Sequence, residues 1–179
     1  AILLWFTMNA TNCSDGVDGL AGSLTLLSLF ALADLLYGVV GYRPIADYLL
    51  IPHNPDGARW AILVATVAGS LAGYLWHNAE PSRVLMGDAG SRLLGMLVGV
   101  AVLAAGNPFL IVVVSPVILV NGGTGLFKLV LLRSFRRIGF DVRPPNTLSL
   151  EAASRQHTLI KVLHSVRFPL HDHCRKNMH

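Results

Sequence analysis

The sequence predicts an all-α protein: a polytopic bundle of membrane-spanning helices with about four full spans, the end of one more, one broken span and a cytoplasmic amphipathic tail. The first observation behind this prediction is composition. Apolar residues make up 53% of the 179 residues and charged residues only 13%, about half of the roughly 25% found in ordinary globular proteins. Such a chain, with a mean hydropathy of +0.56, is suited to lipid rather than water. The second observation is four apolar segments close to the ~20 residues that a helix needs to cross a bilayer.

The elements follow in order along a single domain, residues 1–179. Residues 1–8 are apolar and lack both an initiating Met and a basic leader. They are therefore not a signal peptide, and we expect them to be the end of a span that begins earlier in a longer protein. Residues 9–19 are expected to form a cytoplasmic loop. The four full spans are expected at residues 20–42, 60–76, 91–106 and 109–132. Pro116 and the run Asn121-Gly-Gly-Thr-Gly125 are expected to break the last span.

Basic residues predict which side of the membrane each connector faces. Nine of the fourteen Lys and Arg lie in the tail, residues 133–179, and alternating spans place this tail on the same side as residues 9–19 and 77–90. An excess of Lys and Arg marks the cytoplasmic side, so these connectors should face the cytoplasm. Because the basic residues gather at one span end, the net charge of +4 does not indicate nucleic acid. Within the tail, residues 148–166 predict either a basic helix on the membrane surface or a helix packed on the bundle.

A polar motif at residues 9–22 carries two asparagines and two aspartates. Asp15 and Asp18 are three residues apart, so one helical turn would place both carboxylates on the same face. Two like charges this close repel each other unless a cation or a hydrogen-bond donor joins them. Capping of a helix by Ser14 or Asp15 is the alternative, but a cap needs only one such residue. The motif therefore predicts a site for a ligand or a cation.

A second motif, residues 84–91, comes directly before a predicted span. Asp88 could cap that helix, and its carboxylate is also a hard oxygen ligand for a Mg²⁺ ion that holds substrate phosphates. Gly87 and Gly90 would let the backbone approach a ligand closely. Since this motif is expected on the same side of the membrane as residues 9–19, the two motifs predict one site.

Three further polar features stand apart from these motifs. Residues 171–173 read His-Asp-His and could bind a transition metal, but the adjacent pair Arg175-Lys176 favours phosphate or another anion. Asp34 lies inside a predicted span, where a functional role and a helix–helix hydrogen bond are both open. Lys128 lies inside the broken span and should face either a cavity or the cytoplasmic interface.

With these motifs the chain resembles the phospho-N-acetylmuramoyl-pentapeptide transferases, or translocases I, of the polyprenyl-phosphate N-acetylhexosamine-1-phosphate transferase superfamily. The superfamily patterns N-x-x-N-x-x-D-G-x-D-G-L and M-G-D-x-G-S stand at residues 9–20 and 86–91. The pattern P-L-H-H-H of the muramoyl branch stands at residues 169–173 as PLHDH. Order, spacing and membrane context agree over essentially the whole chain, which we expect to be the C-terminal part of such a protein.

The resemblance implies a ten-helix, Mg²⁺-dependent enzyme of the bacterial cytoplasmic membrane. Such an enzyme transfers phospho-N-acetylmuramoyl-pentapeptide from UDP to undecaprenyl phosphate, which yields lipid I and UMP in peptidoglycan synthesis. Carried over by position, Asp88 is the Mg²⁺ ligand, and Asp15 and Asp18 are catalytic with it. The substrate-binding positions that the resemblance implies are Asn12, Gly16, Asp18, Leu85, Gly87, Lys128, His171 and His173.

The chain departs from the family's pattern at several points. Leu85 stands where a Phe commonly stacks on uracil, Asp172 replaces the middle His, and the family's pair of adjacent aspartates does not occur in residues 1–179. We therefore expect these residues to be inactive alone. Two alternatives stay open: a sister transferase that moves another hexosamine phosphate, and a membrane transporter, which the broken span and Asp34 would suit. A homodimer is a further option.

Overall fold

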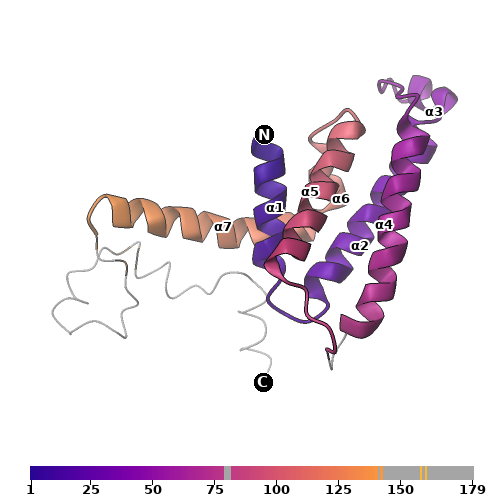
Figure 1. Cartoon of the computed structure of the whole chain (residues 1–179). Coiled ribbons are helices and arrows are strands. Elements are labelled where there is room, and N and C mark those ends of the chain that lie inside the picture. The colour runs from indigo at the N-terminus through magenta and orange to yellow at the C-terminus, as the bar shows by residue number, and fades with distance from the viewer. Residues whose placement is uncertain (79–81, 141, 143–157, 159, 161–179) are drawn as a thin grey trace.

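The computed structural model describes residues 1–78, 82–140, 142, 158 and 160, and this part of the chain is helical, without strands (Figure 1). The all-α prediction is therefore confirmed. The histidine motif and nearly all of the tail beyond residue 140 lie outside the described residues. In chain order the helices are α1 (Ile2–Ser14), α2 (Leu20–Asp34), the π-helix η1 (Leu35–Val40), α3 (Arg43–Tyr48), α4 (Gly57–Asn78), α5 (Asp88–Ala104), α6 (Leu110–Val114) and α7 (Pro116–Arg137).

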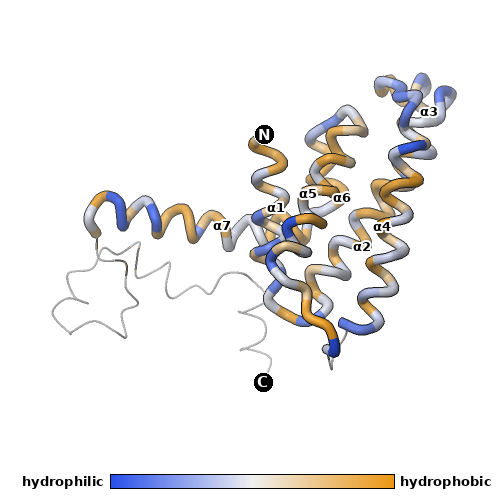
Figure 2. The backbone as a smooth tube through the Cα atoms, in the orientation of Figure 1, coloured by the Kyte–Doolittle hydropathy of each residue, from blue (hydrophilic) through white to orange (hydrophobic). Residues whose placement is uncertain are grey.

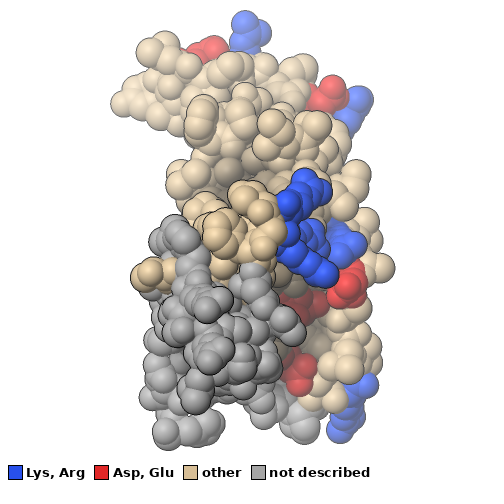
Figure 3. Space-filling model, turned by 90° about the vertical axis from the view of Figure 1, so that its left-hand side faces the viewer, with Lys and Arg blue, Asp and Glu red and all other residues tan. Residues whose placement is uncertain are grey.

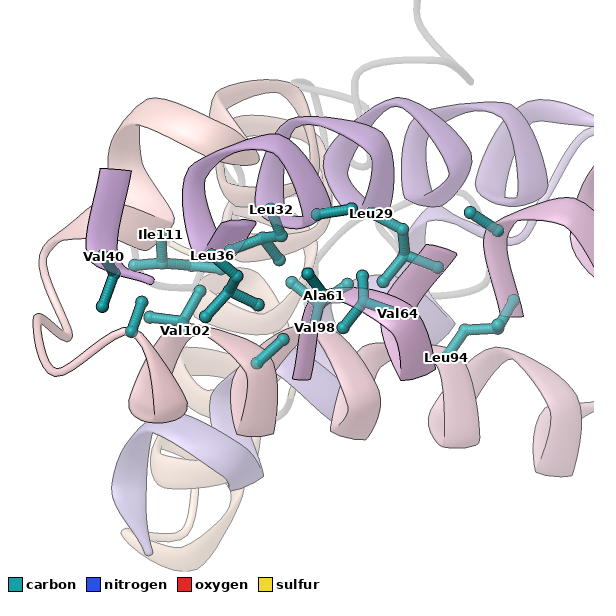
Figure 4. Close-up of a cluster of buried hydrophobic side chains, with 14 of the residues drawn as sticks. Leu29, Leu32, Leu36, Val40, Ala61, Val64, Leu94, Val98, Val102 and Ile111 are labelled. Carbon is teal, nitrogen blue, oxygen red and sulfur yellow. The ribbon is translucent and has the colours of Figure 1, made fainter. Parts of the chain in front are cut away.

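One apolar cluster between α2, α4 and α5 forms the core (Figure 4). On each helix its side chains recur every three or four residues, a spacing that places them on one face. Between membrane helices there is little hydrophobic gain, so close packing and hydrogen bonds hold such a bundle together. Fully buried members of the cluster are Leu29, Leu32, Leu36, Val64, Val98 and Val102.

In the described part of the chain, three stretches of helix are long and apolar enough to cross a membrane: Leu20–Val40, Gly57–Asn78 and Pro116–Arg137. Figure 2 shows apolar residues along most of the bundle. α5 forms where the third span was predicted, but its 17 residues leave it outside this group. The predicted count of four full spans is therefore not confirmed. The outer faces of α2 and α4 expose large apolar side chains, as contact with lipid requires, among them Leu27, Phe30, Ile62 and Trp76.

α1 continues further than the sequence predicted. Residues 9–19 were expected to be a loop, yet residues 9–14 are helical. The face of α1 that packs on its neighbours consists of small and polar residues, Thr7, Ala10, Thr11 and Ser14, all buried. Two of the hydroxyls on this face bond within the helix: Thr7 Oγ1 donates to the Leu4 carbonyl oxygen at 3.1 Å, and Ser14 Oγ donates to the Ala10 carbonyl oxygen at 3.0 Å. Because buried polar groups with partners cost little, the polar motif does not end the helix.

α1 and α5 lie against each other through the glycines of a Gly95-Met-Leu-Val-Gly99 segment. A Cβ on Gly95 would lie 2.5 Å from the Thr7 carbonyl oxygen, and a Cβ on Gly99 would lie 2.6 Å from Thr7 Oγ1. Glycines four residues apart allow helix backbones to approach this closely in membranes. This contact brings the end of α1 beside the start of α5, which is where the two polar motifs lie.

The predicted break in the fourth span occurs at Ser115 and Pro116, between α6 and α7. Ser115 Oγ donates a hydrogen bond to Ser28 Oγ of α2 at 2.8 Å, and both residues are buried. The second predicted break, at residues 121–125, was wrong, because α7 is continuous through it. A Cβ on Gly122 would lie 2.8 Å from Ala10 Cα, so these glycines serve a close crossing of α1. Beyond the crossing, α7 leaves the bundle sideways (Figure 1).

Asp34 lies where α2 passes into η1, and it is exposed. Its carboxylate has no hydrogen bond or ion pair within the described part of the chain. The helix–helix hydrogen bond that was one of two alternatives for Asp34 is thus not formed there.

Candidate functional site

The end of α1, the loop that follows it and the start of α5 bring residues of the two polar motifs together. Asn12 is the link between the helices. Its Nδ2 donates to Ser91 Oγ at 3.0 Å and to Asp88 Oδ1 at 3.3 Å. Ser91 is fully buried, whereas the Asp88 side chain is 82% exposed. One amide therefore fixes the register of the helices while leaving an oxygen of Asp88 open to solvent.

Arg92 completes the first turn of α5. Its Nη2 donates to Asn12 Oδ1 at 3.4 Å and lies 4.0 Å from Asp88 Oδ2. Arg92 was not among the residues predicted from the sequence. Its spacing from Asp88 could have indicated the ion pair, since opposite charges four residues apart meet on one face of a helix.

The carboxylates at the site influence one another. Burial raises the pKa of Asp15 above its ordinary value, a hydrogen bond with Ser91 lowers it, and the neighbouring carboxylates of Asp88 and Asp18 raise it. Asp15 therefore lies within electrostatic reach of both. Because these carboxylates repel one another, the site favours the binding of a cation or a proton. On the face seen in Figure 3, basic side chains lie directly beside acidic ones.

Asn78, at the end of α4, holds the two loops of the site together. Its Oδ1 accepts the Gly19 N–H at 2.9 Å, and its Nδ2 donates to the Val84 carbonyl oxygen at 2.7 Å. Gly19 has a φ of +75°, a conformation that glycine adopts without strain. Asn78 is only 4% exposed. Asn78 was not among the residues predicted from the sequence, although a polar residue at the end of an apolar helix can indicate a hydrogen-bonding role between neighbouring segments.

The other predicted residues of the loops are open to solvent. Gly16, Asp18 and Gly87 are exposed, and Leu85 is 75% exposed. Among the described residues, a Cβ on Gly87, the N-cap of α5, would meet nothing within 4 Å. Within this part of the chain, the space beside Gly87 is therefore open to a ligand.

Two predicted sets of residues are not placed at this site. Lys128 lines a different feature, an apolar groove of about 580 Å³ between α1 and α7. The position agrees with the expectation that Lys128 faces a cavity. His171 and His173 lie outside the described residues. Other residues that line the groove are Trp5, Phe6, Thr124 and Phe127.

Within the described ranges, no group of three or more His, Cys, Asp and Glu is arranged to hold a metal ion by itself. This does not conflict with Mg²⁺, which keeps several water ligands and is usually held by one or two carboxylates together with substrate phosphates. The exposed carboxylate of Asp88 lies close enough to Asp15 for its charge to raise the pKa of Asp15. Two carboxylates arranged in this way fit such a partial site.

A sequence model of glycosyl transferase family 4 matches residues 1–106, more than half of the chain. The chain belongs to glycosyl transferase family 4. The family 4 match contains Asn12, Asp15, Asp18, Asp88 and Arg92. The match covers the N-terminal part of this chain, and residues 107–179 lie beyond it. The expectation that the chain is the C-terminal part of such a protein is not borne out by this match.

Named relatives of this family 4 chain agree with the motif resemblance. The phospho-N-acetylmuramoyl-pentapeptide-transferase of Treponema pallidum (strain Nichols) is 49% identical over 178 residues, which are 99% of this chain and 43% of that protein. The protein of the same name from Helicobacter hepaticus is 35% identical over 115 residues, 64% and 32% of the two chains. The chain thus spans about two fifths of the length of the first of these relatives. The transporter alternative gains no support from them.

Proposed function

We propose that this chain carries part of the active site of a Mg²⁺-dependent phosphoglycosyl transferase. The enzyme would transfer phospho-N-acetylmuramoyl-pentapeptide from UDP to undecaprenyl phosphate. An oxygen of the lipid phosphate forms the new P–O bond, the diphosphate bond of the donor breaks, and UMP leaves with the electron pair. The products are lipid I and UMP. The observation that carries this proposal is the exposed Asp88, held by Asn12 among carboxylates, in a chain whose named relatives are transferases of this kind.

The roles of the residues follow from their positions. Asn12 orients the Asp88 carboxylate through its Nδ2, while the Asp88 side chain stays 82% exposed and accessible to a ligand. Asp15 and Asp18 add negative charge beside it, which makes the site selective for a cation. Mg²⁺ bound there would neutralise the donor diphosphate and the charge that develops on the departing UMP. Leu85 and Gly16 stand on the exposed loops where the nucleoside would bind.

The helices that could span a membrane support the same proposal. A lipid acceptor must be reached from the bilayer, and the structure has three helices long and apolar enough to cross one. We place the site on the cytoplasmic side of the bacterial cytoplasmic membrane, where nucleotide sugars are available. The excess of Lys and Arg at the end of α7, with Arg133, Arg136 and Arg137 exposed, supports this orientation.

The test is UMP release from UDP-N-acetylmuramoyl-pentapeptide by purified full-length protein with undecaprenyl phosphate and Mg²⁺. The wild type should release UMP, and Asp88→Asn should lower the rate by about a hundredfold or more, since loss of a charge-stabilising group typically costs this much. Asp56→Asn, a change at an exposed aspartate paired with Arg59, is the matched control and should retain the rate. Full activity in Asp88→Asn would refute the role of Asp88. Faster turnover of UDP-N-acetylglucosamine as donor would indicate the sister transferase instead.

A further inference from the structure

The positively charged side chain of Arg92 lies among the carboxylates of the proposed metal-ion site. The Arg92 side chain is 49% exposed, and the contact of its guanidinium with Asp88 is long, at 4.0 Å. Its contact with Asn12 Oδ1, at 3.4 Å, is also near the limit of a hydrogen bond. Neither partner therefore holds Arg92 firmly, because strong charge-assisted hydrogen bonds are nearer ~2.7–2.9 Å.

The position of Arg92 would make it a competitor of the proposed metal ion. A positive charge beside Asp88 competes with a metal ion for the same carboxylate. A guanidinium also has five donors in a planar fork that matches the oxygens of a phosphate. If a metal ion bound Asp88, the guanidinium would lose its carboxylate partner, and a diphosphate at the same site would offer it a new one.

We propose that Arg92 is a phosphate ligand, held by Asp88 and Asn12 before substrate binds and transferred to a phosphate oxygen of the nucleotide when the metal ion binds Asp88. This inference rests on the proposed function, because it takes the ligand of the site to be a nucleoside diphosphate. It adds a residue that directly contacts the substrate and predicts two opposite effects of removing it.

The test uses purified full-length protein and two calorimetric titrations, one with Mg²⁺ alone and one with UDP at saturating Mg²⁺. Arg92→Leu should bind Mg²⁺ about fivefold more tightly, since a unit charge about 4 Å away is worth ~1 kcal/mol in water. The same variant should bind UDP about tenfold more weakly, the usual loss for one hydrogen bond to a charged group. Arg92→Lys keeps the charge, so its Mg²⁺ affinity should match the wild type while its UDP affinity falls between the two.

Arg59→Leu is the matched control, because Arg59 also pairs with an aspartate near the start of a helix, at 2.9 Å from Asp56. It should change neither affinity. Tighter Mg²⁺ with weaker UDP in Arg92→Leu supports the inference. Two unchanged affinities overturn it, and so do two weakened ones, which would mean that Arg92 only maintains the fold. UMP release by the wild type decides the proposed function separately, so the two failures are distinguishable.

Discussion

Gly122→Ala should destabilise the protein by pushing α7 away from α1. The added Cβ would lie 2.5 Å from the Ala10 carbonyl carbon, about 0.9 Å short of the 3.4 Å at which ordinary contacts begin. The obstacle is backbone, so a side-chain rotation cannot relieve it. Overpacking of this kind costs about 1–3 kcal/mol, and we expect about 3 kcal/mol here. Ala10 is two residues from Asn12, so UMP release should fall as well.

The assay is reversible unfolding of the purified protein in mixed micelles, followed by circular dichroism, with UMP release measured on the same preparation. Gly73→Ala in α4 is the control, since a Cβ there meets nothing within 4 Å among the residues that the structure describes. Replacing a helical glycine without a clash should stabilise by up to about 1 kcal/mol. If Gly122→Ala is as stable as Gly73→Ala, the close crossing of α1 and α7 does not exist and the reasoning fails.

Two other predictions concern the site. Asp15→Asn should raise the melting temperature of metal-free protein at neutral pH. The pKa of Asp15 is raised in the folded state, so the wild-type carboxyl group favours folding only while it is protonated. This stabilising contribution is lost as the pH rises through the raised pKa. The advantage of the variant should disappear in acid, and an advantage independent of pH would contradict the cause. Asn78→Ala should cost about 2–3 kcal/mol in unfolding experiments, because the Gly19 N–H and the Val84 carbonyl oxygen lose a buried partner. Ser82→Ala removes a 3.5 Å contact to Asn78 and an exposed 3.2 Å hydrogen bond to the Val84 carbonyl oxygen. It should cost less than about 1 kcal/mol, and equal losses in both variants would count against Asn78.

Composition and hydrophobic periodicity predicted the helical bundle and the neighbourhood of the two polar motifs. The prediction worked for Asn12 and Asp88 because each lies at a span end on the same predicted side, and alternating helices bring such ends together. It failed for residues 121–125, where the same glycines are compatible with a broken helix or with a close crossing. Only the contact of Gly122 with Ala10 decides between these, and a contact between distant segments leaves no local pattern.

Asn78 and Arg92 were missed for a related reason. Neither belongs to a motif whose spacing carries chemistry, and each matters through a partner far along the chain: Asn78 through Gly19, and Arg92 through Asn12. Single polar residues of this kind are common at helix ends, where capping and solvation are the ordinary explanations. The local sequence signals at these two positions do not separate a role in the site from such ordinary explanations, whereas the burial of Asn78 and the carboxylates around Arg92 do.

The position of the site depends on α1 more than on any motif residue. One face of α1 meets α5 through Gly95 and Gly99, and it meets α7 through Gly122. These glycines bring helix backbones close together, so they restrict how far α1 can shift along its axis between its neighbours. Asn12 directly follows Thr11, the last α1 residue in these contacts. An Asn12 amide that must bridge Ser91 and Asp88 at hydrogen-bond distance requires that degree of precision, and small residues on facing helices are the means by which a membrane bundle supplies it.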